Sequence, residues 1–597
     1  MRIILGIQEA HDASAALMVD GEIVAAAQEE RFSGLKGDYG YPRQSIEFCL
    51  KQADLGASQI DEVVLATNLW NPVLTKIKRN ANFKVSDWVA EQHKYWKPVL
   101  LENRQVSYYD LFKDRPDFHY DDTYPFDRLL SGYMDKEGMR QAREIRRTTV
   151  SMLLGIPLER VKTIMHEDCH TFYAYFGSPM RGRVLALTSE GIGDYSNGTV
   201  SEFSEEGRHE LAHTRENHLG HIYQYITLLL GMKPNEHEYK VMGLAPYANK
   251  KELDKSYQVF ARIQKVEGLN IVYDEKPPDL YFHFRDKLEG HRFDGIAGAV
   301  QKFVEVMLSE WITACVKATG LNRICFVGGV AQNIKACKRI AELDIVEDLY
   351  VCPAAGDTSV SIGACYYAMW KYLHAHRLSC EAIRPLDKIY LGPEFSDREV
   401  EAFLKRENVA AKFKTIPGVT PEDIARRLAD GQILGRCAGR MEFGLRALGN
   451  RSILADPRRP EAVRKINAAI KFRDFWMPFT PSILAERTRD YIMNPKNLLS
   501  PFMTMAFDST KLAQRDLIAA LHPADLTVRP QILQEEQNPE YYAIIKAFER
   551  LTGVGGVLNT SFNLHGHPIV LGPKEALYTF ENSELDALVL SNYIISR

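Results

Sequence analysis

The 597-residue chain lacks patterned cysteines and long apolar runs. Its nine cysteines are scattered, and no two are spaced as C-x-x-C. This excludes a zinc ribbon and is typical of reduced thiols in a cytoplasmic protein. No stretch reaches the roughly 20 apolar residues of a transmembrane helix. The apolar run near the N-terminus is too short and too interrupted for a signal peptide, so we expect no membrane partner and a cytoplasmic location.

The chain also lacks an excess of one charge. Its formal net charge is −4, with 25% charged residues, which gives no general argument for binding to nucleic acid or to a membrane surface, so we expect no nucleic-acid partner. At roughly 100–200 residues per domain, the length predicts two or more domains. The texture changes between 374 and 397, where an apolar stretch gives way to a polar one with two prolines. We therefore predict domains 1–384 and 385–597, the first α/β and the second α+β.

Two segments about 180 residues apart share one order of elements. "RIILGIQEAHDASAALMVDGEIVAAAQEE" predicts three short strands with a tight "DG" hairpin turn, and "RVLALTSEGIGDYSNGTVSEFSEEGRHELAH" repeats that order. "FVGGVAQN" and "PAAGDTSVSIGA" each place glycine between a strand or loop and a helix, where a phosphate or nucleoside can approach. This order resembles the two-lobed actin-like ATPase fold.

Residues 70–155 are aromatic and charged, and they interrupt the first lobe as an insertion of helices and long loops. Two interpretations of this segment are open. The rings could simply pack between helices, or the segment could supply a pocket for an acceptor substrate.

The second domain gathers arginines beside glycines. "GRCAGRMEFGLRALGNRSILADPR" includes Arg440, Arg446 and Arg451, and "KFR" follows at 471–473. A single arginine is usually a solvated surface charge. The whole set, in a slightly acidic chain, predicts a nucleotide or phosphate site, because guanidinium groups bind phosphates in a bidentate manner.

The blocks of the chain resemble the NodU/CmcH-type O-carbamoyltransferases from residue 3 to about 580. The resemblance rests on "HDASAALMVDGEIVAAAQEERF", "KVMGLAPYA", "VGGVAQN", "GDTSVSIGA" and "GRMEFGLRALGNRSILADPR". The pairing of "KFR" with "SFN" at 561–563 is similar to YrdC-like domains. The resemblance to this family implies that the YrdC-like domain makes carbamoyl-adenylate from carbamoyl phosphate and ATP with Mg(II). The actin-like domain would then transfer the carbamoyl group to a hydroxyl of a small molecule, a natural product or sugar.

Two other functions stay open at this point: a tRNA threonylcarbamoyl-type modification enzyme, and a nucleotide-binding regulator without activity. Against the tRNA-modifying enzyme, its activities usually reside on separate chains. The motifs above argue against an inactive regulator.

The resemblance also assigns roles to residues. His11, with Asp12, would be the base that takes the proton of the acceptor hydroxyl; a structural turn is the alternative. Nucleotide contacts in the first domain would be Lys240, Gly243, Gly328, Gly329 and Asn333. Contacts to carbamoyl phosphate and ATP in the second would be Arg440, Arg446, Arg451, Lys471, Arg473, Arg529, Asn559, Ser561 and Asn563.

"HEDCH" places His166 and His170 four residues apart, on one face of a helix. The spacing alone also fits a plain helix turn. The resemblance implies a divalent ion, thought to be iron, held by both histidines, by Asp357 and by an aspartate in the position that Glu190 occupies here. Glutamate remains an oxygen ligand, although Asp194 could replace it. The donor set suits Fe(II), Mn(II) or Zn(II).

Overall fold

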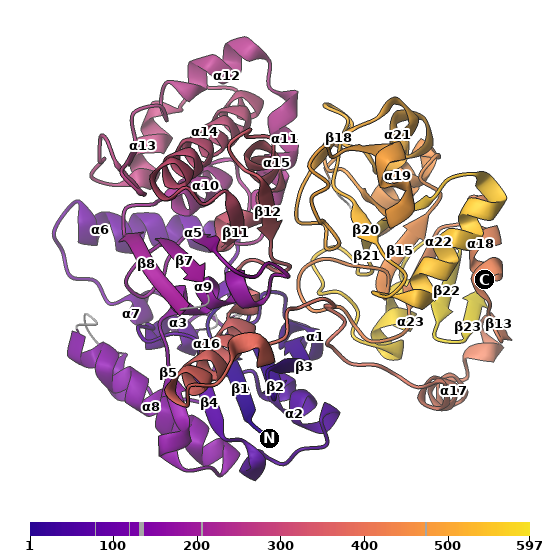
Figure 1. Ribbon diagram of the computed structural model, residues 1–597, viewed down its shortest axis with the longest axis horizontal. Helices are drawn as coiled ribbons and strands as arrows, with labels where there is room; N and C mark the ends of the chain where they lie inside the picture. The colour runs from indigo at the N-terminus through magenta and orange to yellow at the C-terminus, as the bar shows by residue number, and fades with distance from the viewer. Residues whose placement is uncertain (78, 117, 119, 131–135, 205–206, 472–473) are drawn as a thin grey trace. The chain divides into compact units, whose positions relative to one another are not determined.

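The computed structural model describes residues 1–597 apart from 78, 117, 119, 131–135, 205–206 and 472–473 (Figure 1). The chain forms two compact units, Met1–Leu386 and Asp387–Arg597. The boundary predicted after residue 384 lies close to this division. Among the described residues, no helix combines the length and apolar character that crossing a membrane requires.

The first unit contains two mixed sheets with the same strand order (Figure 1). In each sheet, a meander of three antiparallel strands is extended by two parallel strands beside its first strand. The first sheet consists of β1 (Ile3–Gln8), β2 (Ser14–Val19), β3 (Glu22–Gln28), β4 (Glu62–Leu65) and β5 (Val161–Thr163). The second consists of β6 (Val184–Ser189), β7 (Gly198–Ser204), β8 (Gly207–Thr214), β11 (Arg323–Val327) and β12 (Asp348–Val351). The expected duplication is therefore present.

Local chemistry explains the first hairpin. Asp20 and Gly21, between β2 and β3, both have positive φ angles, 48° and 88°. Two residues in this region match the twist of a two-residue hairpin turn. All six residues of β1 are buried, as expected of a strand that is covered on both faces.

Helix α16 (Val360–Ala375) packs on β1 and on helix α9 (His166–Phe176) (Figure 1). A Cβ atom on Gly363 would lie 2.0 Å from the carbonyl oxygen of Cys169. Only glycine permits this approach of α16 to α9. The packing brings the turn at the start of α16 close to the first turn of α9.

The insertion lies between β4 and β5. Its helices are α3 (Pro72–Lys76), α4 (Arg79–Asn82), α5 (Val85–Glu91), α6 (Lys97–Leu100), α7 (Tyr108–Phe112) and α8 (Lys136–Leu154). Phe83 is buried against Trp88, Phe112 and Phe118, with ring centroids 5.7, 4.8 and 5.4 Å away. The interpretation that these rings pack between helices is confirmed for this cluster.

The second unit is built on a mixed sheet in the order β13-β23-β22-β14-β15-β21-β16-β20. These strands are β13 (Lys414–Pro417), β14 (Leu434–Cys437), β15 (Arg451–Ala455), β16 (Thr480–Leu484), β20 (Gln531–Leu533), β21 (Gly556–Ser561), β22 (Ala587–Leu590) and β23 (Tyr593–Ser596). Its longer helices are α17 (Asp397–Arg406), α18 (Pro421–Ala429), α19 (Pro460–Ile466), α22 (Pro539–Thr552) and α23 (Pro573–Glu581). Most strand pairs are antiparallel, as an α+β unit requires.

Candidate metal centre and phosphate-contact residues

Four side chains from three parts of the first unit converge on one point. Helix α9 begins at His166, so His166 and His170 project from its first and second turns. Glu190 directly follows β6, and Asp357 opens the short turn before α16. One ligand atom from each of the four lies within 4.8 Å of every other.

The separations fit a single ion. Glu190 Oε2 lies 3.0 Å from His166 Nε2 and 3.1 Å from His170 Nε2. Asp357 Oδ1 lies 3.4 Å from both ring nitrogens, which are themselves 3.1 Å apart. With metal–ligand bonds of about 2.1 Å, neighbouring ligands are about 3.0 Å apart in an octahedron and about 3.4 Å apart in a tetrahedron.

The burial of the cluster also supports a single bound ion. The side chains of His170 and Glu190 are 0% and 2% exposed. Within the described residues, neither Glu190 carboxylate oxygen accepts a hydrogen bond of good geometry. Such an orphaned buried carboxylate is costly unless a cation satisfies it. The residues present could therefore hold a metal.

Burial and charge interactions shift the pKa values of the cluster residues in opposite directions. Burial alone would lower the pKa of His166, but the charges of Asp357 and Glu190 raise it well above its usual value. Burial would likewise raise the pKa of Glu190, but His170 and His166 keep it lowered. These shifts favour the charged form of the carboxylates.

Asp194 is not part of the cluster. Its Oδ1 accepts hydrogen bonds from Thr67 Oγ1 (2.6 Å) and the Leu69 N–H (2.8 Å). Its Oδ2 accepts from the N–H groups of Asn68 (2.7 Å) and His166 (2.9 Å). Four donors saturate this carboxylate, which favours Glu190 over Asp194 as a ligand, and the choice between the two stays a prediction.

His11 lies beside the cluster, on the turn between β1 and β2. Its Nε2 is 2.8 Å from Asp357 Oδ2, and its Nδ1 is 3.5 Å from Asp12 Oδ2. Burial lowers the pKa of His11, but Asp357 and Asp12 together raise it to about 10. The side chain still keeps 34% of its surface exposed, so solvent weakens this effect. Asp12 has a positive φ of 58° and shapes the turn.

The predicted nucleotide contacts of the first unit lie on separate elements. Gly328 directly follows β11 and has a φ of 102°, and a Cβ atom there would be 2.3 Å from the Ser189 carbonyl oxygen, whereas Gly329 faces open space. Asn333 caps helix α15 (Ile334–Ala341) and pairs with Gln301. Lys240 and Gly243 lie on helix α11 (Glu238–Leu244), the former half-buried and the latter buried. Nucleotide contact by these residues stays a prediction.

In the second unit, the predicted lysine and the "SFN" segment meet. Lys471 is 2% exposed. Its Nζ donates to Ser561 Oγ (3.1 Å), the Asn563 carbonyl oxygen (3.1 Å) and Asn563 Oδ1 (2.6 Å). Asn559, on the same strand β21, is fully buried and its Oδ1 has no hydrogen-bond partner in the described part of the chain. Arg473 lies outside the described residues.

The arginines of the glycine-rich loop differ in their surroundings. Arg451 is 1% exposed and donates to main-chain oxygens of Ala438, Gly439, Asn450, Pro393 and Leu571. Arg440 donates to the carbonyl oxygens of Leu391 and Gly392. Arg446 and Arg529 are half-buried. The contacts of Arg451 give it a structural role in this arrangement, and phosphate contact by the set stays a prediction.

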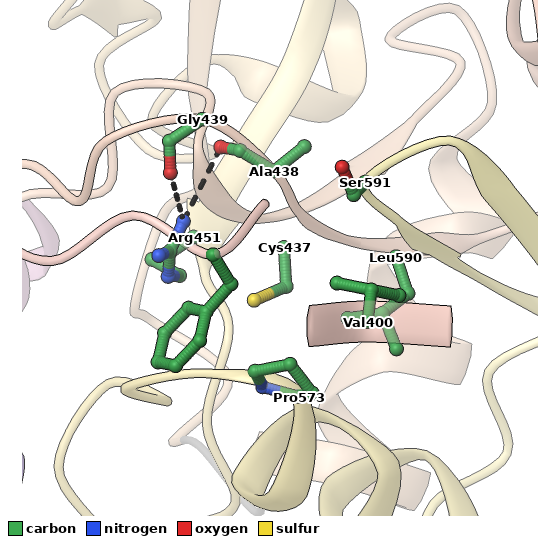
Figure 2. A pocket seen from close by; sticks show the side chains of 9 residues that line it. Val400, Cys437, Ala438, Gly439, Arg451, Pro573, Leu590 and Ser591 are labelled. Atoms are coloured by element: carbon green, nitrogen blue, oxygen red, sulfur yellow. Dashed lines mark hydrogen bonds between the residues drawn. The ribbon is translucent and has the colours of Figure 1, made fainter. Parts of the chain in front are cut away.

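Figure 2 shows a small recess next to Arg451, lined by Cys437, Gly439, Val400 and Pro573 among others. Its volume is about 10 Å³, room for at most one water molecule. The dashed lines mark the bonds from Arg451 to the oxygens of Ala438 and Gly439. This recess is therefore too small for a nucleotide, and it belongs to the packing around the loop.

Glu442 is a further residue of this loop that no sequence pattern predicted. Its Oε1 accepts hydrogen bonds from the N–H groups of Leu448 (2.6 Å), Asn450 (3.2 Å) and Arg451 (3.2 Å). It thereby ties together the loop that carries Arg446. The only signal in the sequence is a lone acidic residue within an arginine-rich segment.

Comparison with known proteins identifies the family. The sequence model described as "Carbamoyltransferase N-terminus" matches residues 3–366, and "Carbamoyltransferase C-terminus" matches residues 425–597. The Synechocystis sp. protein named "Uncharacterized protein sll1178" is 31% identical, with 100% of this chain and 97% of that protein covered. "Nodulation protein NolNO" of Sinorhizobium fredii is 30% identical, with 98% of this chain and 79% of that protein covered.

Among solved structures, component A of the (R)-2-hydroxyglutaryl-CoA dehydratase of Acidaminococcus fermentans is similar at a TM-score of 0.30 and 14% identity. It covers 62% of this chain and 99% of its own. The assignment rests on the family matches, since the first of them alone spans more than half of the sequence. The chain belongs to the carbamoyltransferase family and is a carbamoyltransferase.

Proposed function

We propose that the protein is an ATP-dependent O-carbamoyltransferase with an actin-like first unit and a YrdC-like second unit. In the second unit, water would cleave carbamoyl phosphate to carbamate and phosphate, and the carbamate oxygen would attack the α-phosphate of ATP with Mg(II), giving carbamoyl-adenylate and pyrophosphate. The first unit would transfer the carbamoyl group to a hydroxyl of a small molecule, a natural product or sugar. A carbamoyl carbon is a poor electrophile because nitrogen donates into the carbonyl, and adenylation supplies a better leaving group.

The observation that carries this proposal is the position of His11 beside the four-residue cluster. His11 Nε2 is 2.8 Å from Asp357 Oδ2, and Asp357 Oδ1 faces both histidines. A general base must lie within hydrogen-bond reach of the group it deprotonates and must be neutral. A cation held by the cluster would offset the charge of Asp357, which lowers the pKa of His11 towards the neutral form.

His166, His170, Glu190 and Asp357 would hold this cation, which we propose to be Fe(II), with Mn(II) or Zn(II) as the alternatives that the donor set also suits. When bound, it would supply positive charge that orients the adenylate phosphate. His11 would accept the proton as the acceptor oxygen attacks the carbamoyl carbon and AMP leaves. Asp12 would keep the imidazole oriented.

Lys471 is the centre of the proposed adenylation site. Its ammonium group would offset negative charge that develops on the transferring phosphate. Lys471 Nζ donates to Ser561 Oγ and Asn563 Oδ1, and these hydrogen bonds hold the buried ammonium group in place. Arg446, Arg529, Arg440 and Asn559 would complete the contacts to carbamoyl phosphate and ATP.

The acceptor surface would run from the cluster towards the insertion. Gly220, in helix α10 (Leu219–Leu229), packs against the glycine that follows Glu190. From that helix, rings follow one another with centroids 6.1, 6.1 and 6.3 Å apart: His221, Tyr225, Tyr281 and His93. His93 belongs to the insertion, which supports its proposed part in acceptor binding.

One experiment tests the central claim. The full-length protein is incubated with ATP, Mg(II) and carbon-labelled carbamoyl phosphate, and the products are separated to detect carbamoyl-adenylate and pyrophosphate. Small-molecule alcohols are then screened for label transfer. Absence of ATP-dependent adenylate and pyrophosphate would defeat the proposal.

A further inference from the structure

A buried ion pair lies next to the turn that carries His11. Glu9 follows β1 directly and its side chain is 0% exposed, and Arg146, from α8 of the insertion, is 1% exposed. Arg146 Nε donates to Glu9 Oε2 at 2.9 Å, and the Tyr124 hydroxyl donates to Glu9 Oε1. The guanidinium also lies 4.9 Å from the ring centroid of Trp70. The insertion thus fixes a residue two positions before His11.

The same guanidinium reaches a second segment. Nη1 and Nη2 of Arg146 both donate to the Thr67 carbonyl oxygen, at 3.2 Å each. The Thr67 hydroxyl donates to Asp194 Oδ1 at 2.6 Å, and Asp194 Oδ2 accepts from the His166 N–H at 2.9 Å. A continuous path of hydrogen bonds therefore joins Glu9, Arg146, Thr67, Asp194 and His166.

A second contact reinforces the far end of this path. The carboxylate of Glu167 accepts from the N–H groups of Asp194 (3.0 Å) and Tyr195 (2.9 Å). The first turn of α9 and the turn after β6 therefore hold each other by reciprocal bonds. These two segments carry His166 and Glu190, so a shift in one moves a ligand relative to the other.

We propose that Arg146 and Thr67 are positioning residues, which hold the His11 turn and the metal-ligand helix α9 in register through Glu9 and Asp194. This inference rests on the proposed metal site. It gives the insertion a role in building the catalytic centre as well as in acceptor binding. Outer-shell partners that orient ligands typically change metal affinity 10- to 100-fold when removed.

Thr67→Val is the sharpest test, because it keeps the shape of the side chain and removes only the hydroxyl that Asp194 accepts. Thr67→Ser restores the hydroxyl. Thr227→Val is a matched control, since Thr227 is equally buried but donates to Tyr223 within its own helix. Arg146→Lys keeps the charge beside Glu9 but loses the fork that also reaches Thr67.

The full-length metal-free variants are titrated with Co(II), and the visible absorption bands and dissociation constants are recorded. Circular dichroism and thermal unfolding check that each variant is folded. We expect about tenfold weaker binding and altered bands in Thr67→Val and Arg146→Lys, with wild-type behaviour in Thr67→Ser and Thr227→Val. Pyrophosphate release should stay unchanged in all four, because that step is assigned to the second unit.

Three outcomes would overturn the inference, and each has a different consequence. If the wild type binds Co(II) and folded Thr67→Val binds it with the same affinity and spectrum, the path has no positioning role, and the proposed function is unaffected. If the wild type binds no Co(II), the metal site itself fails together with the inference. A loss of thermal stability alone, with unchanged metal binding, would show that the ion pair acts only on folding.

Discussion

Shortening the acidic ligand from the turn after β6 should damage the metal site. Glu190→Asp restores the residue that the resemblance led us to expect, yet the structure predicts weaker binding. Removing one methylene withdraws the carboxylate by up to about 1.5 Å. This withdrawal would increase the distance from Glu190 Oε2 to His166 Nε2, now 3.0 Å, to roughly 4.5 Å.

That distance exceeds what one ion can span. With bonds of about 2.1 Å, two ligands are at most about 4.2 Å apart, when they lie on opposite sides of the ion. The aspartate would therefore lose contact unless the backbone moves, and the bond between the Glu190 N–H and the Asn197 carbonyl oxygen (3.0 Å) resists such movement. A four-ligand site binds with about 10–16 kcal/mol, so one ligand is worth about 2.5–4 kcal/mol, or about 60- to 700-fold in affinity.

The assay is a Co(II) titration of the metal-free full-length protein, followed by absorption spectroscopy and by equilibrium dialysis. Glu190→Gln, which keeps the length and removes the charge, should also weaken binding. Glu202→Asp is the control, because Glu202 lies on the neighbouring strand β7 and pairs with Arg183 at the surface. Binding by Glu190→Asp that equals or exceeds that of the wild type would refute the reasoning and show that the turn after β6 adapts.

Three further results are expected. His11→Ala should abolish carbamoyl transfer and leave adenylate formation intact; transfer at the wild-type rate would disprove the base assignment. Lys471→Met should reduce ATP-dependent pyrophosphate release at least about 100-fold, because the ammonium that offsets phosphate charge is lost; unchanged release would place adenylation elsewhere. Co(II) binding should release protons, and its affinity should increase from about pH 6 to about pH 8. The carboxylates raise the pKa of His166 despite its burial, so the metal must displace a proton from this imidazole. Titration calorimetry in two buffers of different ionisation enthalpy measures the release, and binding without proton release would contradict it.

Features set by local chemistry could be predicted from the sequence. The "DG" turn at residues 20–21 requires two positive φ angles, which only a few residue types tolerate, and the structure places both there. The repeated strand order follows from apolar runs and turns within about 30 residues. The identity of the four cluster residues came from the family resemblance, and the structure brings all four together.

Contacts decided by packing could not be predicted. Glu9 and Arg146 are 137 positions apart, and neither has a neighbour in the sequence that marks it as one half of a buried pair. Arg451 looked like its neighbours in an arginine-rich loop, but its donors face main-chain oxygens of three separate segments. Such roles depend on which carbonyl groups the fold leaves unpaired at a site, and no local pattern encodes that.

The acidic residues around α9 show how the backbone decides which of them can bind a cation. Asp194 and Glu167 point at free N–H groups of turns and helix ends, and these donors satisfy both carboxylates. Glu190 lacks such donors within the described residues, and Asp357 faces the imidazoles of His11, His166 and His170. The carboxylates of Glu190 and Asp357 would balance the charge of a divalent ion, whereas those of Asp194 and Glu167 already accept hydrogen bonds. The supply of hydrogen-bond donors therefore favours Glu190 over Asp194 as the proposed ligand.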